Sequence, residues 1–211
     1  MLQSVEATRP VLCASLCKVG KTPLMKIRRA AISDVPALVC LNRGVQDMHA
    51  DAFPERFRRD APEEIVERAV GAMIQAPGSY WLVAEEDHPI AFLSAEFRER
   101  EESWCFVAHQ VCYLAGIVVA PRFRRRGIAR ALVGELKREA DTRGVTGIEL
   151  DVWAFNEPAR QVFTRLGFRG MMERMTLAAE NVNNNEGRRR GTFKFLVRPY
   201  IQFRESGRGV P

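Results

Sequence analysis

The sequence predicts an α+β fold, in which a mixed, mostly antiparallel sheet is flanked by helices on both faces. Segments that alternate apolar and polar residues, as strands do, are interspersed with segments whose apolar residues recur at three- and four-residue steps, as on helices. With 211 residues, 46% of them apolar, the chain is long enough for one packed domain. No apolar run approaches the roughly 18–20 residues of a membrane helix, so no membrane partner is expected.

The first part of the chain is expected to form one strand and two helices. Residues 25–31 alternate and predict the strand. Ser33 is the predicted cap of a helix that Pro54 ends, and a second helix is predicted to begin at Pro62 and end at Pro77–Gly78. The residues expected to face inward on the two helices are Leu38, Leu41, Val45 and Met48, then Ile65, Ala69, Ala72 and Met73.

The rest of the chain is expected to alternate strands and helices. Residues 79–85 and 89–96 flank a polar turn and predict a hairpin, and a further strand ends at Val119. Asn156 is a predicted helix cap, and Gly167 a predicted helix stop. The remaining elements expected are helices over 127–142 and 156–167 and strands over 148–153 and 171–177.

Basic residues concentrate at the two ends of the chain. Residues 181–211 hold seven Lys or Arg and two Glu, and residues 1–24 hold three against one, so the formal charge of +6 leaves residues 25–180 at about −1. We predict an N-terminal extension (1–24), a folded domain (25–177) and a basic tail (178–211). The tail fits an added strand pair, a partner-binding segment or a disordered appendage, and nucleic acid is expected to bind only through it.

Cysteine usage bears on the compartment and on metals. Five cysteines without regular spacing are typical of reduced thiols and predict a cytoplasmic protein. Cys13 and Cys17 have no partnering His or Cys pair, so no metal is expected.

Residues 113–132 combine an apolar strand, an arginine-rich loop and a helix opened by small residues. Gly127 and Ala129 let backbone N–H groups approach an anion closely, and the helix dipole points its positive end at the same place. The arginines that add charge there are Arg122, Arg124, Arg125, Arg126 and Arg130. This strand–loop–helix junction is a predicted pyrophosphate site.

Arg124-x-x-Gly127-x-Ala129 resembles the (Arg/Gln)-x-x-Gly-x-(Gly/Ala) signature of the GCN5-related N-acetyltransferases (GNATs), which bind acetyl-CoA. A second segment, from Ile148 to Phe168, resembles the family's strand, its helix opened by Asn and Ala, and its closing Leu-Gly-Phe. The two motifs stand in the family's order and at roughly its spacing. Together they predict a GNAT-like fold, with residues 25–177 as the acetyltransferase domain.

The resemblance implies which residues bind the cosubstrate. The backbone of the strand Ile117-Val118-Val119 diverges from the next strand in this family and bonds the pantetheine arm. Gly116 fits such a break, and a free N–H there would polarise the acetyl carbonyl. Asn156, Ala159 and Phe163 are further expected contacts. The loop residues expected to hold the pyrophosphate are Arg124, Arg125, Arg126, Gly127, Ile128, Ala129 and Arg130.

The general acid is in question because Phe163 replaces a tyrosine that protonates the departing thiolate in many family members. The thiolate then leaves unassisted, takes a proton from water, or receives one from Tyr113, Cys112 or another donor.

The general base also lies away from its common place in the family. The positions that often hold a carboxylate read Leu114-Ala115-Gly116. Glu96 and Asp151 are therefore the predicted catalytic residues, and Glu149 and His109 are further candidates.

The predicted function is transfer of an acetyl group from acetyl-CoA to a primary amine, in a small molecule or a peptide, by direct attack on the thioester. The amine is expected in a groove between the two early helices and the strands around Glu96 and Trp153. The alternative is a regulatory module that binds acyl-CoA but lacks efficient catalysis, which the absent tyrosine and carboxylate favour. Family members are often dimeric, so a homodimer is a further expectation.

Overall fold

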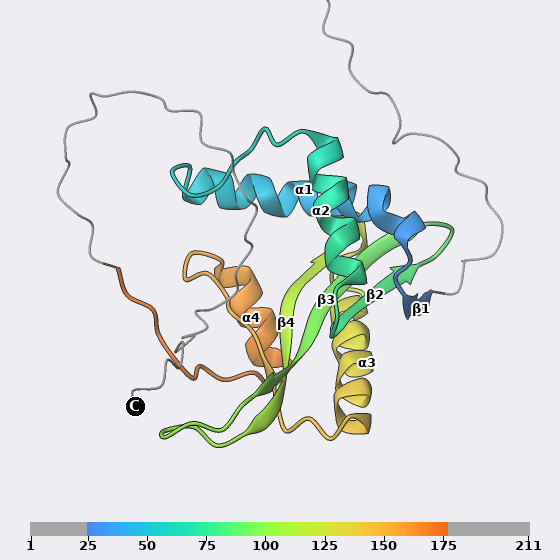
Figure 1. Ribbon diagram of the computed structural model, residues 1–211. Helices are drawn as coiled ribbons and strands as arrows, with labels where there is room; N and C mark the ends of the chain where they lie inside the picture. The colour runs from blue at the N-terminus through green and yellow to red at the C-terminus, as the bar shows by residue number, and fades with distance from the viewer. Residues whose placement is uncertain (1–24, 177–211) are drawn as a thin grey trace, which may run out of the picture. The chain divides into compact units, whose positions relative to one another are not determined.

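The protein contains one five-stranded sheet, seen in a computed structural model that describes residues 25–176 (Figure 1). The strands follow the order β1-β2-β3-β4-β5. The first four pair in antiparallel fashion, and β5 runs parallel to β4. The predicted mixed, mostly antiparallel sheet is therefore confirmed.

The central strands are long and the edge strands are short. The strands are β1 (Lys26–Arg29), β2 (Ser79–Glu85), β3 (Pro89–Arg100), β4 (His109–Val119) and β5 (Ile148–Glu149). The helices are α1 (Val35–Ala52), α2 (Glu63–Gln75), α3 (Ile128–Thr142) and α4 (Glu157–Arg165), with 3-10 turns η1 (Ile32–Asp34) and η2 (Pro121–Phe123). No helix within residues 25–176 is long and apolar enough to cross a membrane.

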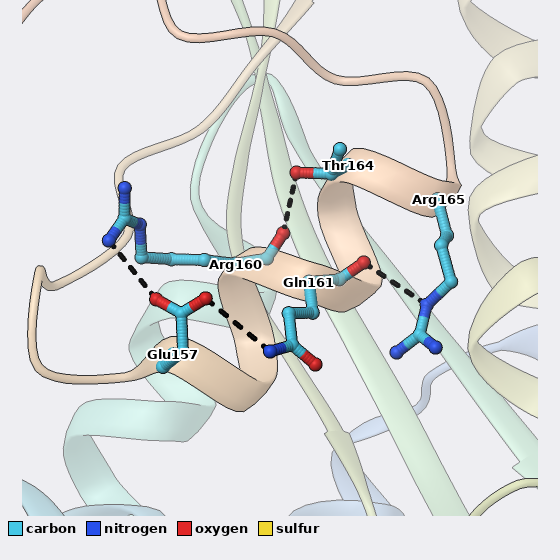
Figure 2. A pocket seen from close by; sticks show the side chains of 5 residues that line it. All are labelled: Glu157, Arg160, Gln161, Thr164 and Arg165. Carbon is cyan, nitrogen blue, oxygen red and sulfur yellow. Dashed lines mark hydrogen bonds and ion pairs between the residues drawn. The ribbon is translucent and has the colours of Figure 1, made fainter.

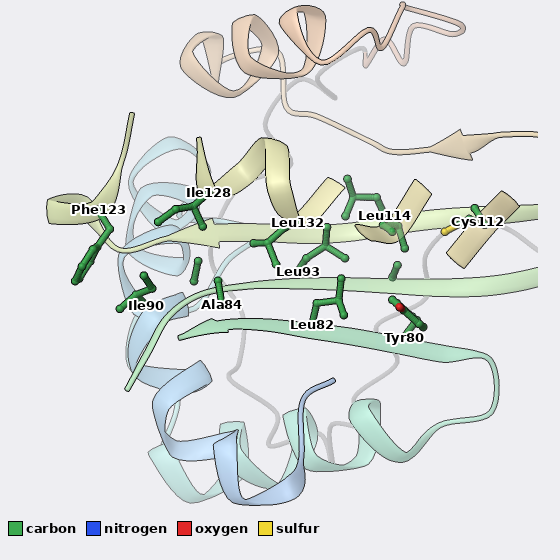
Figure 3. Close-up of a cluster of buried hydrophobic side chains, with 14 of the residues drawn as sticks. Tyr80, Leu82, Ala84, Ile90, Leu93, Cys112, Leu114, Phe123, Ile128 and Leu132 are labelled. Atoms are coloured by element: carbon green, nitrogen blue, oxygen red, sulfur yellow. The ribbon is translucent and has the colours of Figure 1, made fainter. Parts of the chain in front are cut away.

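Helices cover both faces of the sheet, as predicted, because successive side chains of each strand point to opposite sides. On one face, α1 and α2 bury Leu38 and Val70 against Trp81 and Val83. On the other face, α3 buries its predicted apolar stripe against β2, β3 and β4 (Figure 3). Phe163 of α4 packs against the same cluster. The residues of that stripe are Ile128, Leu132 and Leu136.

Two details of the early helices correct the sequence-based expectations. Asp34, not Ser33, precedes α1, and its carboxylate accepts the N–H of Ala31 at 2.8 Å. The expected face of α2 is wrong by one position, because Ile65 and Met73 are exposed. The row that packs against the sheet is Val66, Val70 and Ile74. Two valines and an isoleucine bury more apolar area than a row containing two alanines.

Two predicted strands also differ. Of residues 148–153, only Ile148 and Glu149 pair with β4, after which the chain leaves the sheet. Residues 171–176 form neither a strand nor a helix, since an alternating pattern makes a strand only where a neighbouring strand pairs with it. The proposed domain boundaries stay a prediction, and the expectations for residues 1–24 and 178–211 lie outside the described residues.

Candidate acetyl-CoA site

The arginine-rich loop leads from β4 through η2 into α3. Its backbone enters the left-handed region twice, at Arg125 (φ 63°) and at Gly127 (φ 80°). Glycine adopts this region freely, whereas for arginine it costs about 1–2 kcal/mol. Left-handed residues in such a turn point neighbouring N–H groups into a concavity that suits an anion.

The N–H groups of this loop are free to bind a ligand. Within residues 25–176, those from Arg125 to Arg130 donate to no protein acceptor, and the first backbone bond into α3 joins Ala131 N to Gly127 O at 3.0 Å. The first turn of α3 also contains no acidic residue that would neutralise the positive end of its dipole. A pyrophosphate therefore fits this end of α3 both by hydrogen bonding and by charge.

The loop's arginine side chains retain their charge for a ligand. Within the described residues none of the five pairs with a carboxylate. Arg122 and Arg126 lie over the Phe123 ring at 4.8 and 5.2 Å, and Arg124 Nε donates to the Val119 carbonyl at 3.1 Å. Three guanidinium groups are thus held in place by neutral partners.

The strand leading to the loop has a bulge and an open edge. Ser94 pairs with Gly116 but Ala95 pairs with Leu114, so Ala115 is an extra residue in β4, beside the glycine expected to mark a break. On its other side, β4 pairs with β5 only at Cys112 and Tyr113. From residue 114 onward, the edge of β4 that faces β5 therefore carries no paired strand.

The register of β4 decides which groups line this open edge. Ala120 N donates to the Ile90 carbonyl at 2.9 Å. Because backbone groups alternate sides along an antiparallel strand, Ile117 and Val119 direct theirs to the open edge, and Val118 directs its own toward β3. Of the three residues expected to bond the pantetheine arm, two therefore have backbone groups on the open side.

The second motif opens α4 as predicted. The Asn156 side chain accepts the N–H of Ala159 at 3.2 Å, which caps the helix. The Phe163 ring packs edge-on against Phe168, with centroids 5.6 Å apart. A hollow on the outer face of α4 is lined only by residues of this helix, which bond one another (Figure 2). It contains none of the predicted site residues.

The two predicted catalytic carboxylates come together around Tyr113. The Tyr113 hydroxyl donates to Asp151 Oδ2 at 3.1 Å. The Arg98 guanidinium lies 4.5 Å from the centre of the Tyr113 ring and pairs with the Glu96 carboxylate at 2.6 Å. Sequence reasoning named Glu96, Asp151 and Tyr113 separately, but it missed Arg98 and the contact between Tyr113 and Asp151.

The remaining acid–base candidates lie elsewhere. Cys112 is fully buried, and burial raises the pKa of its thiol to about 11, so it cannot reach a substrate. His109 is exposed at the start of β4, where its Nδ1 lies 2.8 Å from the Val107 carbonyl. Glu149 is the register partner of Tyr113. Within residues 25–176, no group of three or more His, Cys, Asp or Glu is placed to hold a metal ion.

Five aromatic rings gather near Asp151, and we call them the aromatic cluster. They are His49, Phe53, Phe57, Trp153 and Phe155. Ring centroids lie 4.9 Å apart for His49 and Phe57 and 5.1 Å apart for Phe53 and Trp153. Burial lowers the pKa of His49, which favours the neutral ring. Only Trp153 was predicted to line the acceptor groove.

Comparison with known proteins agrees with this fold. Residues 42–168 match the Acetyltransferase (GNAT) family. A ribosomal protein bS18-alanine N-acetyltransferase from Salmonella typhimurium is 44% identical over 55 residues, a match that spans 26% of this chain and 37% of that enzyme.

Solved structures show the same fold at low sequence identity. The BH1408 protein of Bacillus halodurans is 23% identical with a TM-score of 0.69, over 73% of this chain and 99% of its own. The aminoglycoside 6'-N-acetyltransferase AAC(6')-Ih of Acinetobacter baumannii is 24% identical with a TM-score of 0.57, over 75% and 99%. The aminoglycoside N-acetyltransferase AAC(6')-Iy in complex with CoA has the same TM-score at 23% identity, over 77% and 98%.

The open edge of β4, followed by the arginine-rich loop and α3, is the arrangement predicted for an acetyl-CoA site. The chain belongs to the Acetyltransferase (GNAT) family, and its family match covers more than half of its length. The family predicted from the two motifs is confirmed.

Proposed function

We propose that this protein transfers the acetyl group of acetyl-CoA to a primary amine by direct attack of the amine on the thioester. The observation that carries the proposal is that the segment from β4 to α3 has unbonded backbone groups at its two ends, which are the open edge of β4 and the N–H groups of Arg125 to Arg130. One end suits a pantetheine amide chain and the other suits a pyrophosphate.

The two ends of this segment bind different parts of the cosubstrate. The N–H groups of Arg125 to Arg130 hold the pyrophosphate, and Arg124 is fixed by its bond to Val119. The backbone groups of Ile117 and the N–H of Val119 bond the pantetheine arm, beside Asn156 and Ala159 at the start of α4. Acetyl-CoA supplies the acetyl group as an activated thioester. A backbone N–H at the open edge polarises the carbonyl, as in other acyl transfers.

Asp151 is the better placed of the two predicted bases. An amine substrate must lose a proton to become a nucleophile. Glu96 is ion-paired with Arg98, and a proton on Glu96 would disrupt that pair. Asp151 accepts a hydrogen bond from the neutral Tyr113 hydroxyl, so it can take a proton without separating an ion pair. Glu96 then holds Arg98 against the Tyr113 ring.

Tyr113 supplies the hydroxyl that position 163 lacks. Its phenol is a proton donor on the same strand as the open edge, and its bond to Asp151 connects the proposed base with the proposed acid. This arrangement supports the enzyme over the alternative of a catalytically weak binding module, which rested on the absence of these two groups.

The first test is release of CoA thiol from acetyl-CoA in the presence of pooled amines: polyamines, amino acids, aminoglycosides and peptides with free N-termini or lysines. Acceptor-dependent release is the expected result. Tight acetyl-CoA binding without release for any amine class would favour the binding module instead.

A further inference from the structure

The aromatic cluster stands directly beside the proposed base. Trp153 follows Asp151 by two residues, so their Cα atoms lie no more than about 7 Å apart. The rings come from the end of α1, from the turn after it and from the segment that precedes α4. Segments distant in the sequence therefore meet in one group of rings, one member of which is two residues along the chain from the candidate catalytic carboxylate.

The cluster is incompletely covered. Trp153 and Phe155 each keep 37% of their surface exposed, although both contact other rings. Large aromatic residues normally bury most of their area, and exposed ones gathered in one place mark binding surfaces. The exposed ring surface beside Asp151 lacks a partner of matching chemistry among the described residues.

The three acidic residues at the end of α1 and in the turn after it already have arginine partners. Asp47 and Asp51 both pair with Arg59, and Glu55 pairs with Arg56. Burial keeps the His49 ring neutral. Asp151, in contrast, contacts a neutral phenol, so it remains available to a cation. The surface therefore offers one carboxylate next to an apolar, aromatic wall.

We propose that the acceptor is a primary amine that carries an aromatic group a few bonds from its nitrogen. This inference rests on the proposed acetyl transfer and names its substrate class. The amine is held at Asp151 while the aromatic group stacks on Trp153 and Phe155. Rings pair in offset or edge-on arrangements at centroid separations of about 4.5–7 Å, which matches the spacing already found within the cluster.

The same charge pattern argues against polycationic acceptors. Each additional ammonium group of an aminoglycoside or polyamine needs a carboxylate or water to replace its lost hydration. The acidic residues nearest the rings are already paired with arginines. An aromatic amine with one ammonium group places its apolar part on the rings, and it has no second ammonium group that would need a carboxylate or water.

The test compares acceptors with the full-length protein, by CoA thiol release and by calorimetric titration in the presence of CoA. The small-molecule arm sets phenethylamine against ethanolamine, spermidine and kanamycin. The peptide arm sets Phe-Ala-Ala against Ala-Ala-Ala. In each arm in which acetyl transfer occurs, we expect kcat/KM to be at least about tenfold higher for the aromatic acceptor than for the non-aromatic acceptors.

Two variants assign the preference to the cluster. Trp153→Leu should raise the KM for phenethylamine about tenfold and leave the KM for ethanolamine within about twofold. Trp104→Leu is the matched control, because Trp104 is 92% exposed at the turn between β3 and β4, away from the cluster. It should change neither constant.

The outcomes separate this inference from the proposed function. Preference for phenethylamine supports it with a small-molecule acceptor, and reaction of Phe-Ala-Ala alone supports it with a peptide acceptor. Equal or faster reaction of ethanolamine, spermidine or kanamycin overturns the aromatic preference and leaves acetyl transfer intact. No thiol release with any amine overturns both.

Discussion

At the scale of single residues, Gly127 connects backbone conformation with cosubstrate binding. It directly precedes α3 and has a φ of 80°, and a Cβ added there would meet no atom within 4 Å. A side chain at this position would therefore meet no neighbouring atom, although the left-handed backbone costs a non-glycine residue about 1–2 kcal/mol, and it would lie where the pyrophosphate is proposed to bind. Gly127→Glu should weaken acetyl-CoA binding by on the order of a hundredfold, because it adds a negative charge at an anion site.

A matched control exists on the same helix. Gly134 also has open space around its Cβ position, but it lies inside α3, away from the loop. Gly134→Glu should leave acetyl-CoA affinity, measured by calorimetric titration, within about twofold. Retained affinity in Gly127→Glu would refute the pyrophosphate assignment.

Asp151 is the residue on which turnover should depend most. Asp151→Asn removes the proposed base with little change of shape, so kcat should fall by about 10²–10⁴-fold while acetyl-CoA affinity stays unchanged. Asp141→Asn, at an exposed carboxylate of α3 paired with Lys137, is the control. If Glu96→Gln lowers kcat strongly and Asp151→Asn does not, the roles of the two carboxylates are reversed.

At the scale of elements, a partly buried ion-pair network joins β1, the turn before α1 and β2. Arg28 bonds both oxygens of Asp34 at 2.7 and 2.8 Å and reaches Glu85 at 2.7 Å. Asp34 is buried, and the hydrogen bonds from Arg28 hold its pKa below the ordinary value. Asp34→Asn should reduce the free energy of unfolding by about 2–3 kcal/mol at pH 7, because it leaves Arg28 partly uncompensated.

The pH dependence of this pair has a definite sign. A carboxyl whose pKa is lowered by folding contributes stability above its unfolded pKa, near ~3.9, and loses it as pH falls. The difference in urea unfolding free energy between the wild type and Asp34→Asn should therefore shrink below about pH 4. A difference that stays constant from pH 7 to pH 3 would contradict the ion-pair explanation.

The elements also show where sequence reasoning ends. The alternation of apolar and polar residues predicted the strands β1 to β4, and helical spacing predicted the helices α1 to α4, because each of these patterns is local in the sequence. The length of β5 and the bulge at Ala115 were not predictable, since both depend on pairing between distant segments. That bulge shifts the register that brings Tyr113 opposite Glu96, so the proposed catalytic group around Tyr113 could be recognised only in the structure.

At the scale of the whole molecule, the arginine-rich loop was the feature most easily predicted from the sequence, and the aromatic cluster was the least easily predicted. The loop's glycine, arginines and helix start are consecutive in the sequence, so their chemistry could be read together. The aromatic cluster draws rings from residues 49–57 and 153–155, and no local pattern joins them. The residues proposed to bind the cosubstrate are thus neighbours in the sequence, whereas those proposed to select the acceptor are brought together only by the tertiary fold.

The same contrast predicts how much of the chain is needed for cosubstrate binding. Both core clusters and all proposed acetyl-CoA contacts lie between residues 25 and 169, while the excess positive charge lies at the two ends of the chain. We therefore expect a fragment of residues 25–177 to unfold cooperatively and to bind acetyl-CoA within about threefold of the full chain, as measured by urea denaturation and calorimetric titration. Any affinity of the full chain for RNA or duplex DNA should fall steeply with salt and be absent from the fragment, because residues 25–177 hold 22 Lys or Arg and 22 Asp or Glu and so carry no net charge. Loss of cooperative unfolding in the fragment would show that the ends complete the domain, and salt-dependent nucleic-acid binding by the fragment would place that activity in the fold itself.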